Sequence, residues 1–255
     1  MVSLETLAQD IIRADSLVVF TGAGISSESG IPTYRGAGGL WTKYDPNLYA
    51  NINHFNRDPS YYWNFFKDVR YPLLKKAKPN RAHLVLAELE SLGKLKSVVT
   101  QNIDGLHQEA GSARVIELHG NTRVMVCTHC AREYSIDEAF FLLEKELPPL
   151  CTDCRGVLRP DVILFGEALK PQVLDDAFHE AASCDFLIAI GSSLVVNPAA
   201  DIPVTAKRGG AKLAIINIDP TPLDDIADYV ISEPAGDTLS EILSLVKKSL
   251  ASLIT

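Results

Sequence analysis

The stretch Leu17-Val18-Val19-Phe20-Thr21-Gly22-Ala23-Gly24-Ile25-Ser26 decides the fold. Its apolar half predicts a buried strand, and the small residues after it predict a tight turn. A strand that runs into such a turn is the setting in which backbone amides approach a pyrophosphate. Because Ser27 replaces the third glycine of the usual dinucleotide-binding pattern, the turn alone leaves both a dinucleotide site and a purely structural turn open.

Other short apolar runs accompany this strand along the chain. They are nearly continuously apolar, which is typical of strands in a sheet covered on both faces, and they lie at Ser97–Thr100, Val115–Leu118, Val162–Phe165, Phe186–Ile190 and Leu213–Ile218. Helical apolar spacing separates most of them, at 4–12, 82–92 and 173–181, and a last amphipathic helix runs from Leu239 to Leu253 with Asp237 or Thr238 as its cap. This alternation predicts an α/β fold with a Rossmann-like, doubly wound parallel sheet.

Two stretches interrupt the alternation. Residues 36–79 are rich in Trp, Tyr, Phe and Asn, and residues 123–157 contain two cysteine pairs and Pro148-Pro149. We expect both to leave the main sheet and to form a smaller domain together. The nucleotide-binding domain then comprises residues 1–35, 80–122 and 158–255, and the meeting of the two domains is the natural place for a ligand cleft.

Composition excludes several classes of protein. The 255 residues are 47% hydrophobic and carry 24 Lys+Arg against 32 Asp+Glu, a formal net charge of −8. This acidic balance argues against a protein that grips nucleic acid phosphates, and no apolar run reaches the length of a membrane span. The first residues lack the pattern of a secretion signal, and we expect a cytoplasmic protein with reduced thiols.

Four of the five cysteines form two matched pairs. Cys127 and Cys130 make one CxxC loop, and Cys151 and Cys154 make the other after residues 131–150. Two such loops give tetrahedral sulfur coordination of zinc. Since all four positions are thiolates, no site is left open for water or substrate, and the sequence predicts one structural zinc ion. His129, inside the first loop, is expected to face solvent.

Polar side chains follow the predicted strands where their carboxyl ends meet, the edge at which such folds bind ligands. Gln101, Asn102 and Asp104 follow one strand and His119 follows another. His119 is the candidate general base near neutral pH. Ser192, Ser193, Asn217 and Asp219 stand at two further strand ends, where Asn and Asp suit the hydroxyls of a ribose, and Arg35 after the glycine turn suits an anion.

Taken together, these motifs resemble one known family. The chain is similar to the sirtuins, NAD-dependent protein-lysine deacylases, over essentially its whole length, and looks most like the compact prokaryotic members. The matching motifs, in sirtuin order, are the two cysteine pairs, Gly22-Ala23-Gly24-Ile25-Ser26-Ser27-Glu28-Ser29-Gly30-Ile31-Pro32, Thr100-Gln101-Asn102-Ile103-Asp104, Leu118-His119-Gly120, Phe165-Gly166-Glu167 and Gly191-Ser192-Ser193-Leu194.

The resemblance implies a Rossmann-type domain and a small domain made of a helical insertion and a zinc module, with NAD and an acyl-lysine protein or peptide entering the cleft between them. The acyl oxygen would attack the nicotinamide ribose as nicotinamide leaves. His119 would then act as base on a ribose hydroxyl, giving free lysine and O-acyl-ADP-ribose, and Asn102 would position ribose and a water.

The resemblance also implies contact residues for NAD and for the peptide. The NAD contacts would be Gly22, Ala23, Gly24, Ser26, Thr33, Tyr34, Arg35, Gln101, Asn102, Ile103, Asp104, Gly191, Ser192, Ser193, Asn217, Asp219 and Ala235. The peptide would pair largely through main-chain atoms, beside Val162, Phe165, Gly166, Glu167 and Val195.

The sequence departs from the family pattern at two places. Tyr34 stands where the family usually has Phe, and it keeps a ring that can shield the reactive ribose. Phe66 and Val69 align with the Tyr and Arg of desuccinylating sirtuins, while Arg70 lies one residue away. This favours acetyl or longer apolar acyl groups over acyl groups that carry a carboxylate.

Three other functions compete with the deacylase. The first alternative is an NAD-dependent protein mono-ADP-ribosyltransferase, which would use the same cleft. A non-catalytic nucleotide sensor or zinc-ribbon interaction module is the second, and a classical NAD oxidoreductase is the third, although no hydride-transfer constellation is visible.

Overall fold

The structure is a computed structural model that describes residues 3–36 and 38–252. A six-stranded parallel sheet forms its centre, in the order β3-β2-β1-β7-β8-β9. The strands are β1 Leu17–Thr21, β2 Leu95–Thr100, β3 Val115–Glu117, β7 Phe186–Ile190, β8 Lys212–Ile216 and β9 Tyr229–Ile231. The expected doubly wound α/β fold is confirmed.

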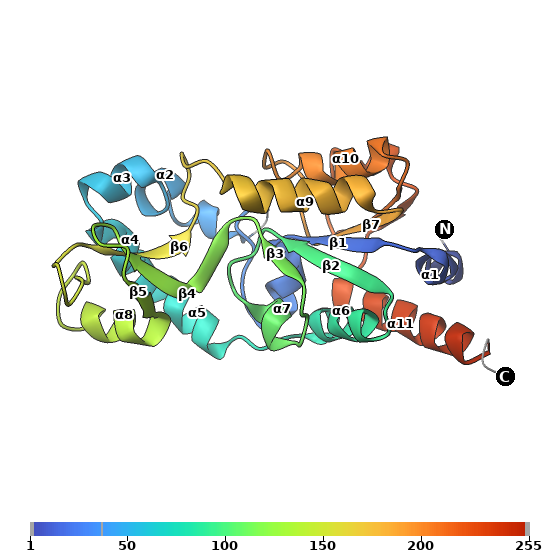
Figure 1. The fold of residues 1–255 in the computed structure, drawn as a ribbon, viewed down its shortest axis with the longest axis horizontal. Helices are drawn as coiled ribbons and strands as arrows, with labels where there is room; N and C mark the ends of the chain where they lie inside the picture. The colour runs from blue at the N-terminus through green and yellow to red at the C-terminus, as the bar shows by residue number, and fades with distance from the viewer. Residues whose placement is uncertain (1–2, 37, 253–255) are drawn as a thin grey trace.

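Helices cover both faces of this sheet, as Figure 1 shows. One face carries α1 Leu4–Arg13, α6 Arg81–Ser91 and α11 Ala235–Ser252, and the other carries α9 Pro171–Ser183 and α10 Asp201–Arg208. Because side chains alternate along a strand, Leu17 and Val19 pack into the first core while Val18 and Phe20 pack into the second. This double burial explains why β1 reads as a continuous apolar run.

A smaller unit lies at the far end of the molecule from the two termini (Figure 1). Its antiparallel sheet has the order β5-β4-β6, formed by Glu133–Ser135, Gly120–Cys127 and Leu158–Val162. The helices around it are α2 Pro46–Tyr49, α3 Ile52–Arg57, α4 Ser60–Phe65, the π-helix η3 Phe66–Arg70, α5 Tyr71–Lys76 and α8 Ile136–Leu143. Residues from the insertion and from the cysteine module share one hydrophobic core.

Short helices complete the fold at the junction and on the surface. They are η1 Ala23–Ser29, η2 Leu40–Thr42, α7 Leu106–Glu109 and η4 Asp224–Ile226. Within the described residues, no helix is both long and apolar enough to cross a membrane.

The expected strand Val162–Phe165 is wrong. The strand in this region is β6, Leu158–Val162, and it pairs with β4 in the small sheet instead of joining the main sheet. Proline has no backbone N–H to donate to a neighbouring strand. Pro160 is tolerated in β6 because β6 is an edge strand of the small sheet. Phe165 makes only an isolated bridge to Asn51.

Several helices and strands begin or end at other residues than expected. The expected runs to Leu118 and Ile218 end at Glu117 and Ile216, and the short β9 was not expected. The last helix begins at Ala235, ahead of the expected caps, because the Glu28 carboxylate accepts a 3.0 Å hydrogen bond from the Gly236 amide. Leu253 lies outside the described residues.

The small sheet extends past both ends of the expected 123–157 module, since β4 begins at Gly120 and β6 ends at Val162. This places β6, which the sequence analysis assigned to residues 158–255 of the large domain, beside the cysteine module. The division of the chain into two domains stays a prediction.

Trp63 ties the helical insertion to the small sheet, and this contact generates a first prediction. Its side chain is fully buried, and its indole Nε1 donates a 3.0 Å hydrogen bond to the Leu158 carbonyl oxygen of β6. Trp63→Phe removes the donor and leaves both a void and an unpaired buried carbonyl. We expect it to lower the free energy of unfolding by about 2–4 kcal/mol.

Urea denaturation followed by far-UV circular dichroism measures the loss. Tyr61→Phe is the matched control, because Tyr61 is an exposed residue of the same helix. A Trp63→Phe protein as stable as the control would show that Trp63 does not join the two parts.

Candidate functional site

Two loops cross with their backbones in contact, and this crossing forms the floor of the candidate site. The Gly22 and Gly24 amides, directly after β1, donate to the carbonyl oxygens of Ile190 and Gly191 at the end of β7, over 3.0 and 2.8 Å. A Cβ on Gly191 would lie 2.3 Å from the Ile25 amide nitrogen, and Gly191 has φ +60°. Glycine is therefore required where the loops cross.

Above this crossing lies a cavity of about 950 Å³, in the size range of ligand pockets. Most of the residues singled out from the sequence line it. They are Gly22, Ala23, Gly24, Thr33, Tyr34, Arg35, Gln101, Asn102, Ile103, His119, Val162, Phe165, Gly166, Glu167, Gly191, Ser192, Ser193, Asn217, Asp219 and Ala235. The cavity joins the glycine turn, the strand ends and His119 in one space.

Three expected contact residues do not line this cavity. Ser26 and Asp104 lie in a smaller adjoining hollow of about 30 Å³, which shares Asn102 and Ile103 with the main cavity. Val195 lines neither space, and its side chain is 52% exposed.

The cavity has further lining residues that were not expected to contact a ligand. Trp41, Arg70, Asn197 and Glu233 line the cavity, but Phe66 and Val69 do not. Arg70 is buried, with its guanidinium carbon 5.6 Å from the centre of the Tyr34 ring and 5.4 Å from that of Phe65. Arg70, which lies one residue from the aligned position of Val69, belongs to the π-helix, and Val69 does not line the cavity.

His119 follows β3 and has one ring nitrogen committed. Its Nδ1 lies 2.9 Å from the main-chain carbonyl oxygen of Gln101, which only accepts, so Nδ1 carries the proton and Nε2 keeps its lone pair. Burial lowers the pKa of His119, with the hydrogen bond to Gln101 opposing this effect. The ring is therefore neutral at pH 7 and can accept a proton at Nε2.

Asn102 is held by a network at the end of β2. Its side-chain Nδ2 donates to Ser26 Oγ over 3.1 Å, and Ser26 Oγ donates to Asp104 Oδ2 over 2.7 Å. Burial raises the pKa of Asp104. Gln101 Nε2 in turn donates to Ser192 Oγ over 2.7 Å, which joins the β2 and β7 loops. These bonds fix polar groups before any ligand enters.

A buried chain of hydrogen bonds supports the site from below. His107 Nε2 lies 2.9 Å from Thr21 Oγ1, whose proton goes to Thr100 Oγ1 at 2.7 Å, and Thr100 Oγ1 also accepts from the Asn102 amide at 3.0 Å. The His107 ring packs against that of His83, with ring centres 4.9 Å apart. Burial lowers the pKa of His83 to about 4 and of His107 to about 3, so both rings are neutral.

The four paired cysteines form a separate site. Their sulfur atoms all lie within 4.8 Å of one another, with 3.5 Å between Cys127 and Cys154 and 3.6 Å between Cys130 and Cys151. Tetrahedral zinc with bonds of about 2.3 Å to sulfur gives edges of about 3.8 Å, which these positions fit. Tyr134 Oη donates to Cys151 Sγ over 3.1 Å and stabilises the thiolate form.

This cluster is the site of one structural zinc ion. None of the four cysteines lines the cavity, and four thiolates complete the coordination, so the metal holds the small sheet together. His129 is exposed and lies outside the cluster, as expected.

Comparison with known proteins gives consistent results. A sequence model of a protein family, described as "Sir2 family", matches residues 22–198 of the chain. A protein named NAD-dependent protein deacetylase from Saccharolobus solfataricus is 49% identical over 97% of this chain and 99% of its own length. NAD-dependent protein deacylase 1 of Archaeoglobus fulgidus is 44% identical, with the same coverage of both chains.

A solved structure described as "Sir2-p53 peptide-NAD+" superposes with a TM-score of 0.89 at 38% identity, covering 95% of this chain and 98% of that one. Another, described as "Structural Basis for the Mechanism and Regulation of Sir2 Enzymes", has a TM-score of 0.89 at 45% identity and covers 96% and 98%.

The buried histidine pair generates a second prediction. In the unfolded chain both imidazoles titrate near their usual pKa of about 6.5, far above their values in the folded protein. The unfolded state therefore binds two more protons between about pH 6.5 and 4. We expect the free energy of unfolding to fall as the pH drops through this range, by up to about 2.7 kcal/mol per pH unit.

Urea denaturation at several values between pH 7 and 5 measures this slope. His107→Gln should remove about half of it, whereas His179→Gln should leave it unchanged, because His179 is exposed on α9. Equal slopes in all three proteins would contradict the assignment to the buried pair.

Proposed function

Since the chain belongs to the Sir2 family, we propose that it is an NAD-dependent protein-lysine deacylase whose reaction centre is the cavity between the glycine crossing and His119. The observation that carries this proposal is the joining of both features in one space. The products are nicotinamide, the free lysine side chain and O-acyl-ADP-ribose.

NAD, when bound, supplies the ADP-ribosyl group whose bond to nicotinamide breaks. The residues present fit this co-substrate: glycines at the loop crossing leave room where a Cβ would intrude, and Asn217 and Asp219 line the cavity at the end of β8. Arg35 lines it as well and provides positive charge for an anionic group.

His119 serves as the base in this proposal. Its Nδ1–H donates to the Gln101 carbonyl oxygen, so Nε2 keeps a free lone pair in a residue that lines the cavity and takes the proton of a ribose hydroxyl. The lowered pKa keeps this nitrogen unprotonated at neutral pH. Asn102, fixed by Ser26, orients the ribose.

Aromatic side chains cover the reaction centre. The Tyr34 and Trp41 rings stack with centres 5.2 Å apart, and the Trp41 and Phe165 rings form a T-shaped pair with centres 6.1 Å apart. All three line the cavity. We assign them the exclusion of water, which would otherwise compete with the acyl oxygen for the ribose.

Open main-chain groups offer a place for the acylated peptide. Within residues 3–36 and 38–252, the backbone groups of Gly166, Ser193 and Val195 make no hydrogen bond. Gly166 and Ser193 also line the cavity. An extended peptide lying between these segments would pair through its own backbone, which explains how the acyl-lysine is held with little demand on neighbouring side chains.

The acidic net charge supports a protein or peptide substrate over nucleic acid. None of the five cysteines forms a disulfide, which supports a reducing compartment, and we propose the cytoplasm.

An assay with an acetyl-lysine peptide tests the proposed function. We expect deacetylated peptide and nicotinamide to form in equal amounts and only when NAD is present. Mass spectrometry and chromatography measure both products. Equal product without NAD would overturn the proposal, and transfer of label from NAD onto protein as the main outcome would favour the ADP-ribosyltransferase.

His119→Ala tests the assigned base. Removing the imidazole should lower kcat by about 10²-fold or more, while NAD binding, measured by calorimetry, should change little because the glycine crossing is untouched. His179→Ala is the control, since His179 is an exposed residue of α9. A His119→Ala enzyme with the turnover of this control would remove His119 from the mechanism.

A further inference from the structure

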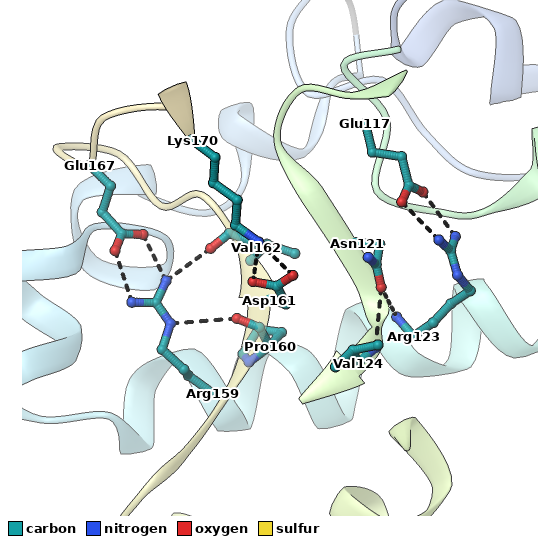
Figure 2. Close-up of polar contacts among 10 residues, drawn as sticks. All are labelled: Glu117, Asn121, Arg123, Val124, Arg159, Pro160, Asp161, Val162, Glu167 and Lys170. Carbon is teal, nitrogen blue, oxygen red and sulfur yellow. Dashed lines mark hydrogen bonds and ion pairs between the residues drawn. The ribbon is translucent and has the colours of Figure 1, made fainter. Parts of the chain in front are cut away.

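The mechanism above does not use the ion pair between Arg159 and Glu167. This pair lies beside residues 162–167, the peptide-binding segment, which contains Gly166 with its open backbone groups. Arg159 belongs to β6, and its guanidinium reaches the carboxylate of Glu167 in the segment that follows the strand (Figure 2). Nη1 donates to Oε1 over 2.8 Å and Nη2 to Oε2 over 2.7 Å. Nη2 also donates to the Val162 carbonyl oxygen over 2.9 Å.

The Glu167 carboxylate has a third partner. Its Oε2 accepts a 2.7 Å hydrogen bond from the Leu164 amide, so the side chain folds back on its own segment. The two ion-pair side chains are about one-fifth exposed, at 20% and 21%. Burial opposes ionisation of Glu167, yet the hydrogen bonds from Arg159 and Leu164 hold its pKa below the usual value. Glu167 therefore faces inward, toward Arg159 and Leu164.

The same segment is anchored at its other side by backbone bonds. The Ile163 amide donates to the His119 carbonyl oxygen over 2.9 Å, and the Phe165 amide donates to the Ala50 carbonyl oxygen over 2.8 Å. Residues 162–167 thus connect the candidate base, the helical insertion and β6. Gly166, with φ +90° and an open backbone, lies between Phe165 and the clamped Glu167.

A second ion pair repeats the arrangement. Along β6, residues 158, 160 and 162 are buried, so Arg159 and Asp161 share the outward face of the strand. Lys170 Nζ lies 2.7 Å from both carboxylate oxygens of Asp161 (Figure 2). Because this pair is more exposed, at 47% and 30%, its attraction is more strongly screened by solvent.

We propose that the Arg159–Glu167 pair positions the peptide-binding segment, so that it sets the affinity for the acyl-lysine peptide without touching the peptide. The proposal rests on the function proposed above. It changes the role expected of Glu167 from a substrate contact to a positioning residue. The pair suits this role because a forked guanidinium fixes direction as well as distance.

Steady-state kinetics of Glu167→Gln and Arg159→Lys test the proposal. The first variant keeps one acceptor oxygen but loses the charge, and the second keeps the charge but loses the fork. We expect both to raise KM for the acetyl-lysine peptide, by about tenfold for Glu167→Gln. KM for NAD and kcat should stay within about twofold of the wild-type values.

Glu146→Gln is the matched control. Glu146 pairs with Arg155 through hydrogen bonds of 3.0 and 2.7 Å to one guanidinium nitrogen, and neither residue lines the cavity. Its KM values should equal those of the wild-type protein. The double variant Arg159→Lys/Glu167→Gln should be no worse than Glu167→Gln alone, because the two residues act as one unit.

Several outcomes would overturn the proposal. If Glu167→Gln raises KM for the peptide while Arg159→Lys keeps the wild-type value, Glu167 contacts the substrate itself. If both variants keep the wild-type value, the pair has no positioning role. If KM for NAD rises equally, or the melting temperature falls well below that of Glu146→Gln, the effect is general loss of structure.

Failure of the proposed function is detected separately. A wild-type protein without NAD-dependent deacylation would refute that function before any variant is compared.

Direct binding of a labelled acetyl-lysine peptide, followed by fluorescence anisotropy, gives a second readout. The same two variants should bind this peptide more weakly, by the factor found for KM.

Discussion

The close contact of two backbones is the constraint on which the site depends. β1 and β7 are neighbours in the parallel sheet, and the turns after them meet where Gly24 donates to the Gly191 carbonyl oxygen. A side chain at either glycine would lie within 3 Å of the opposite backbone. This contact leaves the space above it free of side chains, and the cavity opens there. The cofactor space is therefore a consequence of strand order and of two glycines.

Support for this arrangement comes from buried polar groups that do not line the cavity. Thr21 and Thr100 end adjacent strands, and their hydroxyls join β1 to β2 directly beneath Asn102. His107 Nε2 forms a further hydrogen bond with the Thr21 hydroxyl, and the His107 ring packs against the ring of His83. A neutral imidazole serves here because a charge in this apolar layer would have no counter-ion. The strand ends are thus held in register before NAD arrives.

A pattern within a short stretch of sequence predicts those features of the fold that depend on that stretch alone. The strands β1 and β7 were predicted because each is a continuous apolar run of a few residues. The cysteine cluster was predicted because each CxxC loop contains two of its ligands within four residues. The expected strand at Val162–Phe165 failed because an apolar run does not reveal its partner, and Leu158–Val162 pairs with β4 instead. The place of Arg70 beside Tyr34 was not predicted, because it depends on a π-helical turn and on packing between distant segments.

Three carboxylates near the cleft are bound within the protein. Glu28 accepts from the amide of Gly236, Asp104 from Ser26, and Glu167 from Arg159 and Leu164. These three acidic groups are engaged within the protein, whereas Asp219 and Glu233 line the cavity without a side-chain hydrogen bond or ion pair among the described residues. In the proposed function, the peptide would meet the open backbone groups of Gly166 and Ser193 and the ring of Phe165, because these residues line the cavity and Glu167 is already bound to Arg159.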